Sequence, residues 1–499
     1  MEVGLSVSGS GKRVLVVSGD TLPLAGLPTT GAGLRAWGLG QGLASRGHDV
    51  HYLMPAAGLQ RAAPGVDTSA YQSISYDHLY PQELNRRLIE LSPDVIVFQH
   101  WASAVHLSER NRIPVVIDFH GPLLLETLYQ DLPHLDALRQ LKIRTLPKAD
   151  FFTCAGERQR HYFYPWLLLS GIDVRQDVIQ VIPVSISPDV PARAMADGEV
   201  TFVYGGVFLP WQDPSVSLET LVQTLEARRA GRLKLFGGAH THIQIPPGKY
   251  RDLIPRLEAS PRVDSIGMLA RDALVQTYLR SHVAIDVMAR NPERELAFTT
   301  RTVEYLWCGL PVIYNDYAEL ADYIRDYDAG WTVDPLDAGA IRAVVESILD
   351  DPASLERKSR NAQTLVRERL SWDRTIEPLD AFCRHPRRRR AGKRTPMFHA
   401  VGQDWFLEDI VDRTRADVRR ARRSVFARSK ALVKEVAKRW LKRSYVTDML
   451  GRPMRVDAPL LAGQRREGSF RASAANLSGI DLLVGTFGRL NSCDVALYL

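Results

Sequence analysis

Cysteines, long apolar runs and an apolar N-terminal segment are scarce or missing in this 499-residue sequence. The four cysteines stand far apart and form neither a disulfide framework nor the paired spacing of a zinc site. No stretch approaches the roughly 18 apolar residues of a membrane-spanning helix. Residues 1–13 lack the apolar core of a signal peptide. These absences predict a cytoplasmic protein without disulfides. The cysteines are Cys154, Cys308, Cys383 and Cys493.

Basic residues are concentrated in one segment of the chain. The whole sequence has a net charge of +7, but residues 384–443 hold 20 Lys and Arg against 6 Asp and Glu, a net charge of +14. The remaining residues therefore have a net charge of −7. We expect any preference for an anionic surface to map to this segment.

Short apolar runs alternate with helical stretches over two parts of the chain, which predicts parallel strands in doubly wound α/β sheets. A charged, proline-containing stretch at residues 187–199 separates the two parts. We therefore expect one domain at residues 13–190 and a similar one at 200–383, with their strand ends around one cleft. The expected strands are 14–18, 49–54, 94–98, 114–118, 150–155, 178–183, 201–205, 233–236, 283–287, 311–314 and 330–333.

The chain beyond the second domain has a different composition. Residues 384–450 predict a basic loop and a long helix at 404–444, with an apolar residue at every seventh position from Val411 to Leu432. The basic stretch lacks interleaved stacking aromatics, which argues against nucleic acid. The helix would lie on an anionic membrane surface, or it would pair with its copy or act as a spacer. Residues 451–499 alternate as β-strands and predict a truncated β-sandwich.

The expected first long helix opens with the glycines Gly31 and Gly33, which fit the pattern G-x-G-x-x-A. Eleven residues separate Gly19 from Gly31, and no acid ends the second strand, so the context argues against a dinucleotide site. The two glycines would instead let a phosphate or a sugar approach the N–H groups that begin the helix. The alternative is that they serve only close packing of the helix.

A polar loop leads into the expected helix at 300–308 and gives the stronger candidate site. Thr299 and Thr300 would offer backbone N–H groups to a diphosphate, and Arg301 would add a positive charge. Glu304 lies one turn further on and could accept hydrogen bonds from ribose hydroxyls. The alternative is an ordinary helix cap followed by a surface pair of Arg301 with Glu304.

Four segments in this order carry a resemblance to a known family: Gly31-Ala32-Gly33, Asp118-Phe119-His120-Gly121-Pro122, Gly205-Gly206 and residues 301–311. Together they resemble the retaining, metal-independent GT-B glycosyltransferases of group 1 or family 4, over about residues 13–380. The resemblance implies two facing Rossmann-like domains, followed here by the basic helix and the β segment. It also implies that the first domain binds the acceptor, that the second binds a nucleoside-diphosphate sugar, and that a helix near 372–382 crosses back.

The resemblance also implies roles for single residues. His120 is expected beside the transferred sugar, and Gly205 and Gly206 beside the nucleotide. The family's paired glutamates stand eight positions apart, but the position eight before Glu304 is Leu296. Either Glu293 or Glu295 would therefore hold hydroxyls of the donor sugar.

Two further features concern charge at the expected nucleotide site. The Arg and Lys that often follow the first strand of the donor domain are replaced here by residues 207–213. Arg301 is therefore expected to substitute for them at the diphosphate. The sequence Asp326-Tyr327-Asp328 matches the D-x-D of metal-dependent glycosyltransferases, but it falls in a turn rather than at a strand end. We expect neither a metal nor a cofactor.

These observations favour a cytoplasmic hexosyltransferase-like enzyme that moves a sugar from a nucleoside diphosphate to a glycan or lipid-linked acceptor. Its place would be the synthesis of a cell-surface polysaccharide, peripherally at the inner membrane or self-associated through residues 404–444. Two alternatives remain open. One is a nucleotide-sugar epimerase of the same two-domain shape, and the other is an inactive scaffold that binds carbohydrate or membrane.

Overall fold

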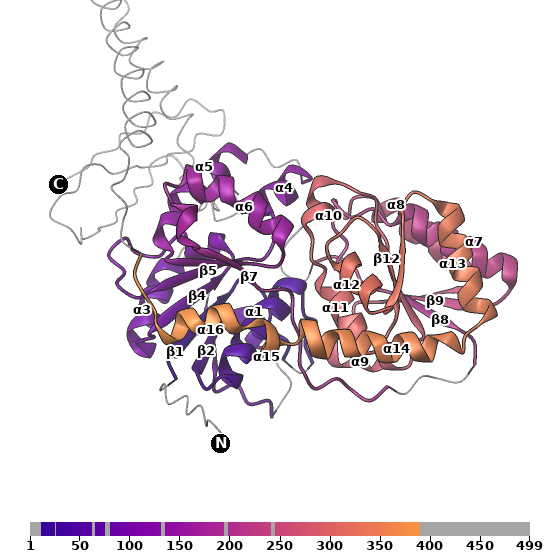
Figure 1. The fold of residues 1–499 in the computed structure, drawn as a ribbon, viewed down its shortest axis with the longest axis horizontal. Helices are drawn as coiled ribbons and strands as arrows, with labels where there is room; N and C mark the ends of the chain where they lie inside the picture. The colour runs from indigo at the N-terminus through magenta and orange to yellow at the C-terminus, as the bar shows by residue number, and fades with distance from the viewer. Residues whose placement is uncertain are drawn as a thin grey trace, which may run out of the picture. The chain divides into compact units, whose positions relative to one another are not determined.

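The computed structural model describes most of the first 389 residues (Figure 1). The described residues are 11–24, 26–61, 65–74, 80–130, 135–193, 198–240 and 245–389. The expected helix at 404–444, the expected β segment at 451–499 and Cys493 lie outside them.

The first sheet has seven parallel strands, in the order β3-β2-β1-β4-β5-β6-β7. The winding direction therefore reverses between β1 and β4. Val14 of β1 pairs with Val50 on one side and Val95 on the other. The strands are β1 (Arg13–Ser18), β2 (Asp49–Pro55), β3 (Tyr71–Ile74), β4 (Val95–Gln99), β5 (Val115–Phe119), β6 (Phe151–Cys154) and β7 (Ile179–Val181).

The second sheet has six parallel strands, in the order β10-β9-β8-β11-β12-β13. Here the winding direction reverses between β8 and β11. Ala284 of β11 pairs with Val203 on one side and Val312 on the other. The strands are β8 (Thr201–Tyr204), β9 (Arg232–Phe236), β10 (Val263–Gly267), β11 (Val283–Asp286), β12 (Val312–Asn315) and β13 (Gly330–Val333).

Helices cover both faces of each sheet (Figure 1). Along β1, Leu15 and Val17 belong to one apolar core, whereas Val14 and Val16 belong to the core on the opposite face. A strand buried on both faces needs apolar residues at consecutive positions, which explains the continuous apolar runs of the sequence. The helices of the first domain are α1 (Gly31–Ser45), α2 (Ala56–Leu59), α3 (Tyr80–Leu91), η1 (Trp101–Ala104), α4 (Leu123–Leu128), α5 (Leu135–Thr145), η2 (Leu146–Lys148), α6 (Glu157–Leu169) and η3 (Val174–Gln176).

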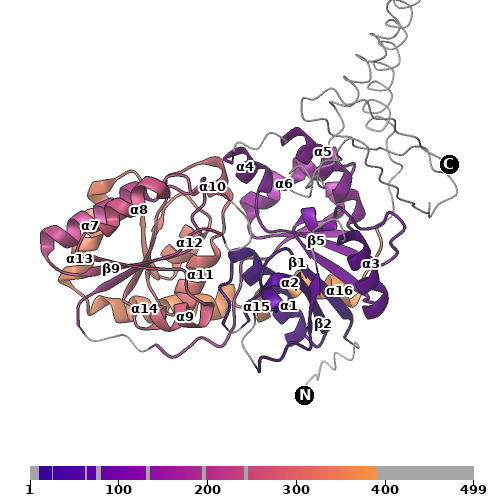
Figure 2. The ribbon, with the colours of Figure 1, turned by 180° about the vertical axis from the view of Figure 1, so that it is seen from behind.

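The helices that follow the first domain include two that return to it. They are α7 (Ser215–Arg228), α8 (Tyr250–Glu258), α9 (Arg271–Leu279), α10 (Pro292–Leu296), α11 (Thr300–Trp307), α12 (Leu320–Asp326), α13 (Ala338–Asp350), α14 (Ser354–Leu365), η4 (Val366–Leu370), α15 (Trp372–Thr375) and α16 (Glu377–Arg384). The last two lie beside α1 and the first sheet (Figures 1 and 2). Trp372 packs edge-on against Trp37 of α1, and Phe382 stacks on Phe151 of β6.

This architecture confirms the prediction of two Rossmann-like α/β domains. The sequence did not predict the edge strands β3 and β10. Most residues of these two strands remain partly or fully exposed, so their sequences mix polar and apolar side chains. Among the residues that the structure describes, no helix combines the length and the apolarity needed to cross a membrane.

The two domains contact each other through hydrogen bonds and an ion pair. The carboxylate of Glu319 accepts hydrogen bonds from the backbone N–H groups of Glu157 and Arg158 at 3.0 and 3.2 Å, so a residue of the second domain caps α6 of the first. Asp20, after β1, pairs with His240 of the second domain at 3.2 Å. These contacts hold the carboxyl edges of the two sheets together.

Candidate functional site

The two points at which the sheets reverse their winding locate the candidate site. Ligands of open α/β sheets bind beyond the carboxyl ends of the strands at such a point. In the first sheet the loop after β1 and η1 after β4 border it. In the second sheet the loop after β8 and the loop after β11 border it. Most of the residues predicted from the sequence lie on these loops or on the helices that follow them.

The start of α1 meets the start of α11. A Cβ atom added to Gly31 would lie 3.1 Å from Thr300 Oγ1 and 4.0 Å from His120 Cε1. Three predicted residues, Gly31, His120 and Thr300, are thus neighbours although they belong to two domains. Gly33 has a different role, because an added Cβ atom there would lie 1.8 Å from the carbonyl oxygen of Thr21. Gly33 allows the loop after β1 to pack directly on the helix.

His120 follows β5, and its ring is neutral at physiological pH. Burial lowers the pKa of His120 to about 4, although the nearby Asp118 carboxylate partly offsets this effect. Its Nδ1 atom is buried and has no hydrogen-bond partner among the described residues. A neutral imidazole can both donate and accept hydrogen bonds, which suits the hydroxyl groups of a sugar.

A buried ion pair supports the loop that carries His120. Arg35 of α1 binds both oxygens of Asp118, with Nη2 and Nε at 2.8 and 3.1 Å. Nη1 of Arg35 also donates to the carbonyl oxygens of Ile182 and Pro183. Arg35 and Asp118 are both buried, so this bidentate pair joins α1 to the ends of β5 and β7.

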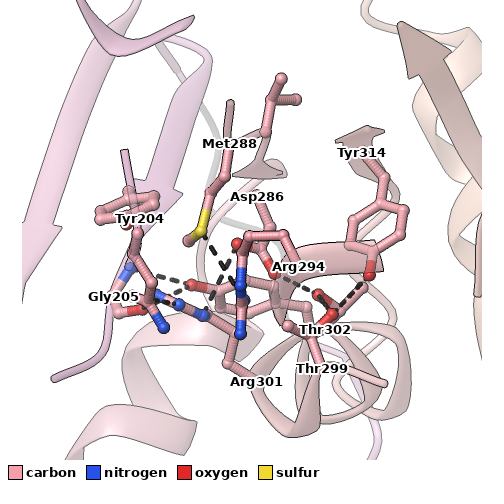
Figure 3. A network of polar contacts seen from close by, with 12 residues as sticks. Tyr204, Gly205, Asp286, Met288, Arg294, Thr299, Arg301, Thr302 and Tyr314 are labelled. Atoms are coloured by element: carbon pink, nitrogen blue, oxygen red, sulfur yellow. Dashed lines mark hydrogen bonds and ion pairs between the residues drawn. The ribbon is translucent and has the colours of Figure 1, made fainter. Parts of the chain in front are cut away.

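Arg301 joins α11 to the loop after β8 (Figure 3). Its Nη1 atom donates to the carbonyl oxygen of Gly205 at 2.7 Å, and Nη2 donates to Gln212 Oε1 at 2.8 Å. A Cβ atom on Gly206, whose φ is +136°, would lie 2.7 Å from Nη1. Arg301 is therefore committed to protein oxygens, and its positive charge lies directly behind the Gly205–Gly206 turn.

Asp286, the last residue of β11, is the anionic partner of this arginine. Its Oδ1 atom lies 3.6 Å from Arg301 Nε, and its Oδ2 atom accepts a hydrogen bond from Thr302 Oγ1. The hydroxyl of Thr299 is bonded to Tyr314 at 2.6 Å and does not cap α11 (Figure 3). The Thr299 side chain therefore satisfies none of the first backbone N–H groups of α11.

Glu304 forms an ion pair with Arg271, a residue that no sequence pattern marks. Nε of Arg271, at the start of α9, donates to Glu304 Oε1 at 2.8 Å. The backbone N–H of Arg271 also donates to the carbonyl oxygen of Leu27 in the first domain at 3.0 Å. Any contact of Glu304 with a ribose would be made beside this ion pair.

The structure separates the two glutamates between which the sequence could not decide. Glu293 is buried and paired with Arg294 at 2.5 and 2.8 Å. Glu295 is 40 % exposed and paired with Arg290 at 2.8 Å. Asn291 caps α10 by accepting the backbone N–H groups of Glu293 and Arg294, which fixes the direction of this short helix.

Glu126 of α4 faces Glu293 across the domain boundary. An added Cβ atom on Gly121, next to His120, would lie 2.7 Å from Glu126 Oε1. Burial raises the pKa of Glu126 to about 8, the Glu293 carboxylate contributes to the increase, and Arg294 partly offsets it. Glu126 therefore holds a proton at neutral pH beside the candidate site.

Two other charged features lie away from these loops. Asp328, the second acid of the D-x-D pattern, forms ion pairs with Arg357 and Lys358 in the turn after α12. At the start of the basic segment, Arg389 donates its backbone N–H to Asp150 and Arg388 donates to the carbonyl oxygen of Ile113. These first basic residues therefore contact the first domain.

The sequence contains a signal for two acidic residues whose ion pairs at the site were not predicted from it. Asp118 and Asp286 each lie near the carboxyl end of a fully buried strand, where an acid is uncommon unless it is paired. Arg271 and Glu126 gave no such signal. Their partners are distant in the sequence and no local pattern connects them.

Comparisons with known families and solved structures agree with this architecture. The family described as Glycosyltransferase Family 4 matches residues 29–189, and the family described as Glycosyl transferases group 1 matches residues 189–365. No curated protein matches the chain.

The similar solved structures are glycosyltransferases of low sequence identity. Sucrose-phosphate synthase from Thermosynechococcus elongatus is 18 % identical with a TM-score of 0.58, and the match covers 75 % of this chain and 98 % of that one. Anabaena Alr3699/HepE in complex with UDP-glucose is 15 % identical with a TM-score of 0.54, and the match covers 74 % of this chain and 98 % of that one. WaaG, a glycosyltransferase involved in lipopolysaccharide biosynthesis, is 15 % identical with a TM-score of 0.52, and the match covers 74 % of this chain and 99 % of that one.

At such identities the structural matches establish the fold, and the family matches establish the activity class. The two families follow each other along the chain and together cover residues 29–365, which carry every strand of the two sheets except β1. The chain belongs to the group 1 glycosyltransferases with the GT-B fold.

Proposed function

We propose that this glycosyltransferase moves a hexosyl group from a nucleoside-diphosphate sugar to a hydroxyl group of a glycan or lipid-linked acceptor. The observation that carries the proposal is the meeting of Gly31, His120 and Thr300 where α1 and α11 begin. The N–H groups at the start of α11, with the charge of Arg301 behind them, would stabilise the leaving diphosphate. The neutral ring of His120 would bind a hydroxyl of the transferred sugar.

A uridine diphosphate sugar is the first donor to test. The structures of Anabaena Alr3699/HepE contain UDP, glucose or UDP-glucose, and their fold is similar to that of this chain. Transfer with retention of the anomeric configuration is part of the proposal and rests on the family resemblance. NMR of the product, compared with the donor, tests the configuration.

A panel of UDP-, GDP- and dTDP-sugars separates the proposed activity from its alternatives. Transfer to an acceptor, or hydrolysis of the donor, supports a glycosyltransferase. Conversion of one nucleotide sugar into another supports an epimerase. Calorimetric binding of a nucleotide without turnover of any sugar supports an inactive binding scaffold. Absence of both binding and turnover contradicts the proposal.

The basic segment is assigned a separate role in this proposal. Residues 384–450 would hold the enzyme peripherally at an anionic inner membrane surface, where a cell-surface polysaccharide is built, or would mediate self-association. Each Lys or Arg near an anionic leaflet contributes about 1 kcal/mol before screening. Flotation with anionic liposomes at low salt should retain the full chain and lose a chain that ends at residue 383. Sedimentation measures self-association.

A further inference from the structure

His100 has an unusual backbone conformation at the end of β4. Its φ is +97°, a region that residues other than glycine rarely occupy. Its backbone N–H donates to the carbonyl oxygen of Asp118 at 2.9 Å, and its Nδ1 atom accepts a hydrogen bond from the N–H of Ala102 at 3.2 Å. Two contacts therefore hold the strained residue in place. Strain of this kind is concentrated at functional sites.

These contacts also determine where the proton of the ring lies. Nδ1 accepts a hydrogen bond from a backbone N–H, so it carries no proton itself. Burial lowers the pKa of His100 to about 3, and electrostatic interactions with His120 and Lys142 act in the same direction, so the ring is neutral. The one ring proton is therefore on Nε2. Nε2 is buried and has no hydrogen-bond partner among the described residues.

His100 lies at the point at which the first sheet reverses its winding. His100 follows β4, and the neighbouring loop follows β1. A Cβ atom added to Gly19 in that loop would lie 3.7 Å from Ser103 Oγ in η1, so the two loops lie side by side. The hydroxyl of Thr29 in the same loop and Nδ1 of His120 are also buried without a partner among the described residues.

We infer that His100 Nε2–H donates a hydrogen bond to a hydroxyl oxygen of the acceptor sugar. The inference rests on the proposed function and deepens it. A hydroxyl group can accept from Nε2–H while it donates to a second acceptor, whereas a phosphate can only accept. The transferred sugar is assigned to His120 after β5, where the first domain meets Thr300, so a hydroxyl bound beyond the neighbouring strand β4 is assigned to the acceptor.

Two substitutions separate a binding role from a structural one. In His100→Asn the side-chain oxygen replaces Nδ1 as the acceptor for Ala102, and Asn is among the residues that tolerate positive φ. This variant keeps the cap and loses only the Nε2–H donor. In His100→Gln an amide N–H reaches the position of Nε2, but the acceptor for Ala102 is lost. The inference predicts a weaker acceptor site in the Asn variant and partial recovery in the Gln variant.

The experiment uses the full chain, UDP-glucose as donor, and methyl α-D-glucoside, α-D-galactoside and α-D-mannoside as acceptor probes. His100→Asn should keep the thermal unfolding midpoint, the calorimetric affinity for UDP and the rate of UDP-glucose hydrolysis. It should raise the KM of the acceptor about tenfold, the effect expected from losing one hydrogen bond. A histidine that only caps η1 or binds water would leave the KM of the acceptor unchanged, and that result overturns the inference.

Two measurements remain decisive if the chain transfers no sugar. Saturation-transfer NMR should detect a methyl glycoside on the wild type and not on His100→Asn, and absence of binding to both overturns the inference. NMR of ¹⁵N-histidine should show a protonated Nε2 on His100, and a protonated Nδ1 overturns it as well. Failure of the proposed function is recognised separately, because the wild type would then bind and turn over no nucleotide sugar.

Discussion

A Cβ atom on Gly31 would lie 3.1 Å from Thr300 Oγ1, so the first residue of α1 packs against the first residue of α11. Helix N-termini carry a partial positive charge, and here two of them meet at the domain boundary. A donor sugar bound at α11 would therefore have Gly31 and the first domain directly beside it. This contact also makes position 31 sensitive to any side chain.

Gly31→Ala is expected to lower transfer without lowering stability. Gly31 begins α1 with a φ that is not positive, so alanine fits the backbone there and the unfolding midpoint should change little. The added methyl group would crowd Thr300, and kcat/KM should fall about tenfold. The double variant Gly31→Ala/Thr300→Ala removes the crowded hydroxyl oxygen of Thr300, so it tests whether crowding causes the loss of kcat/KM. If kcat/KM in Gly31→Ala matches that of the wild type, the contact has no role in transfer.

Arg301→Ala is expected to destabilise the second domain. The side chains of Arg301 and Asp286 are 15 % and 1 % exposed, and removing one partner of a buried pair costs about 3–5 kcal/mol. Urea unfolding measures this change. Arg290→Ala is the matched control, because it removes an arginine from an exposed pair with Glu295, and its midpoint should not move. Equal effects of the two substitutions would contradict the structural role of Arg301.

The sequence predicted the strands with continuous apolar runs and the residues next to helix starts. The β5 run Val115–Phe119 is fully buried, and such runs leave a clear signal. Strand β3, Tyr71–Ile74, has only one buried residue at the sheet edge and left none. At the site, Gly31 and Thr300 could be identified from local patterns and His120 from the family resemblance, and the three are neighbours.

Other parts of the site depend on contacts that no local pattern contains. His100 is distinguished by its φ of +97° and by its buried ring nitrogen, neither of which the sequence shows. Glu126 is distinguished by its proximity to Glu293, which is 167 positions further along the chain. Only the approach of the two domains brings these groups together.

Glu126 should make stability depend on pH. The pKa of Glu126 rises in the folded chain from about 4.5 to about 8, so the folded chain holds a proton that the unfolded chain releases between these values. The contribution of Glu126 to the free energy of unfolding therefore falls as the pH rises through this range. Glu126→Gln removes that contribution and should gain stability relative to wild type between about pH 5.5 and pH 8.5 in urea unfolding. Parallel profiles for the two proteins would contradict this assignment.

Sugar transfer should proceed without a divalent metal. The positive potential that would stabilise the leaving diphosphate comes from the start of α11 and from Arg301, which lies behind Gly205. Within the part of the chain that the structure describes, no group of three or more His, Cys, Asp or Glu residues is placed to hold a metal ion. Transfer should continue in excess EDTA. Loss of activity in EDTA and its recovery with manganese would contradict the expectation.

Glu293→Gln should lower transfer far more than Glu295→Gln. Glu293 is buried at the domain boundary near Glu126, whereas Glu295 is 40 % exposed and paired with Arg290. A carboxylate that binds the donor sugar contributes a charge-assisted hydrogen bond, so kcat/KM should fall by about 10² in Glu293→Gln and by less than about twofold in Glu295→Gln. Circular dichroism and calorimetry with UDP must show that Glu293→Gln still folds and binds nucleotide, because Arg294 loses its charged partner. The reverse order of the two variants would make Glu295 the residue that contacts the sugar.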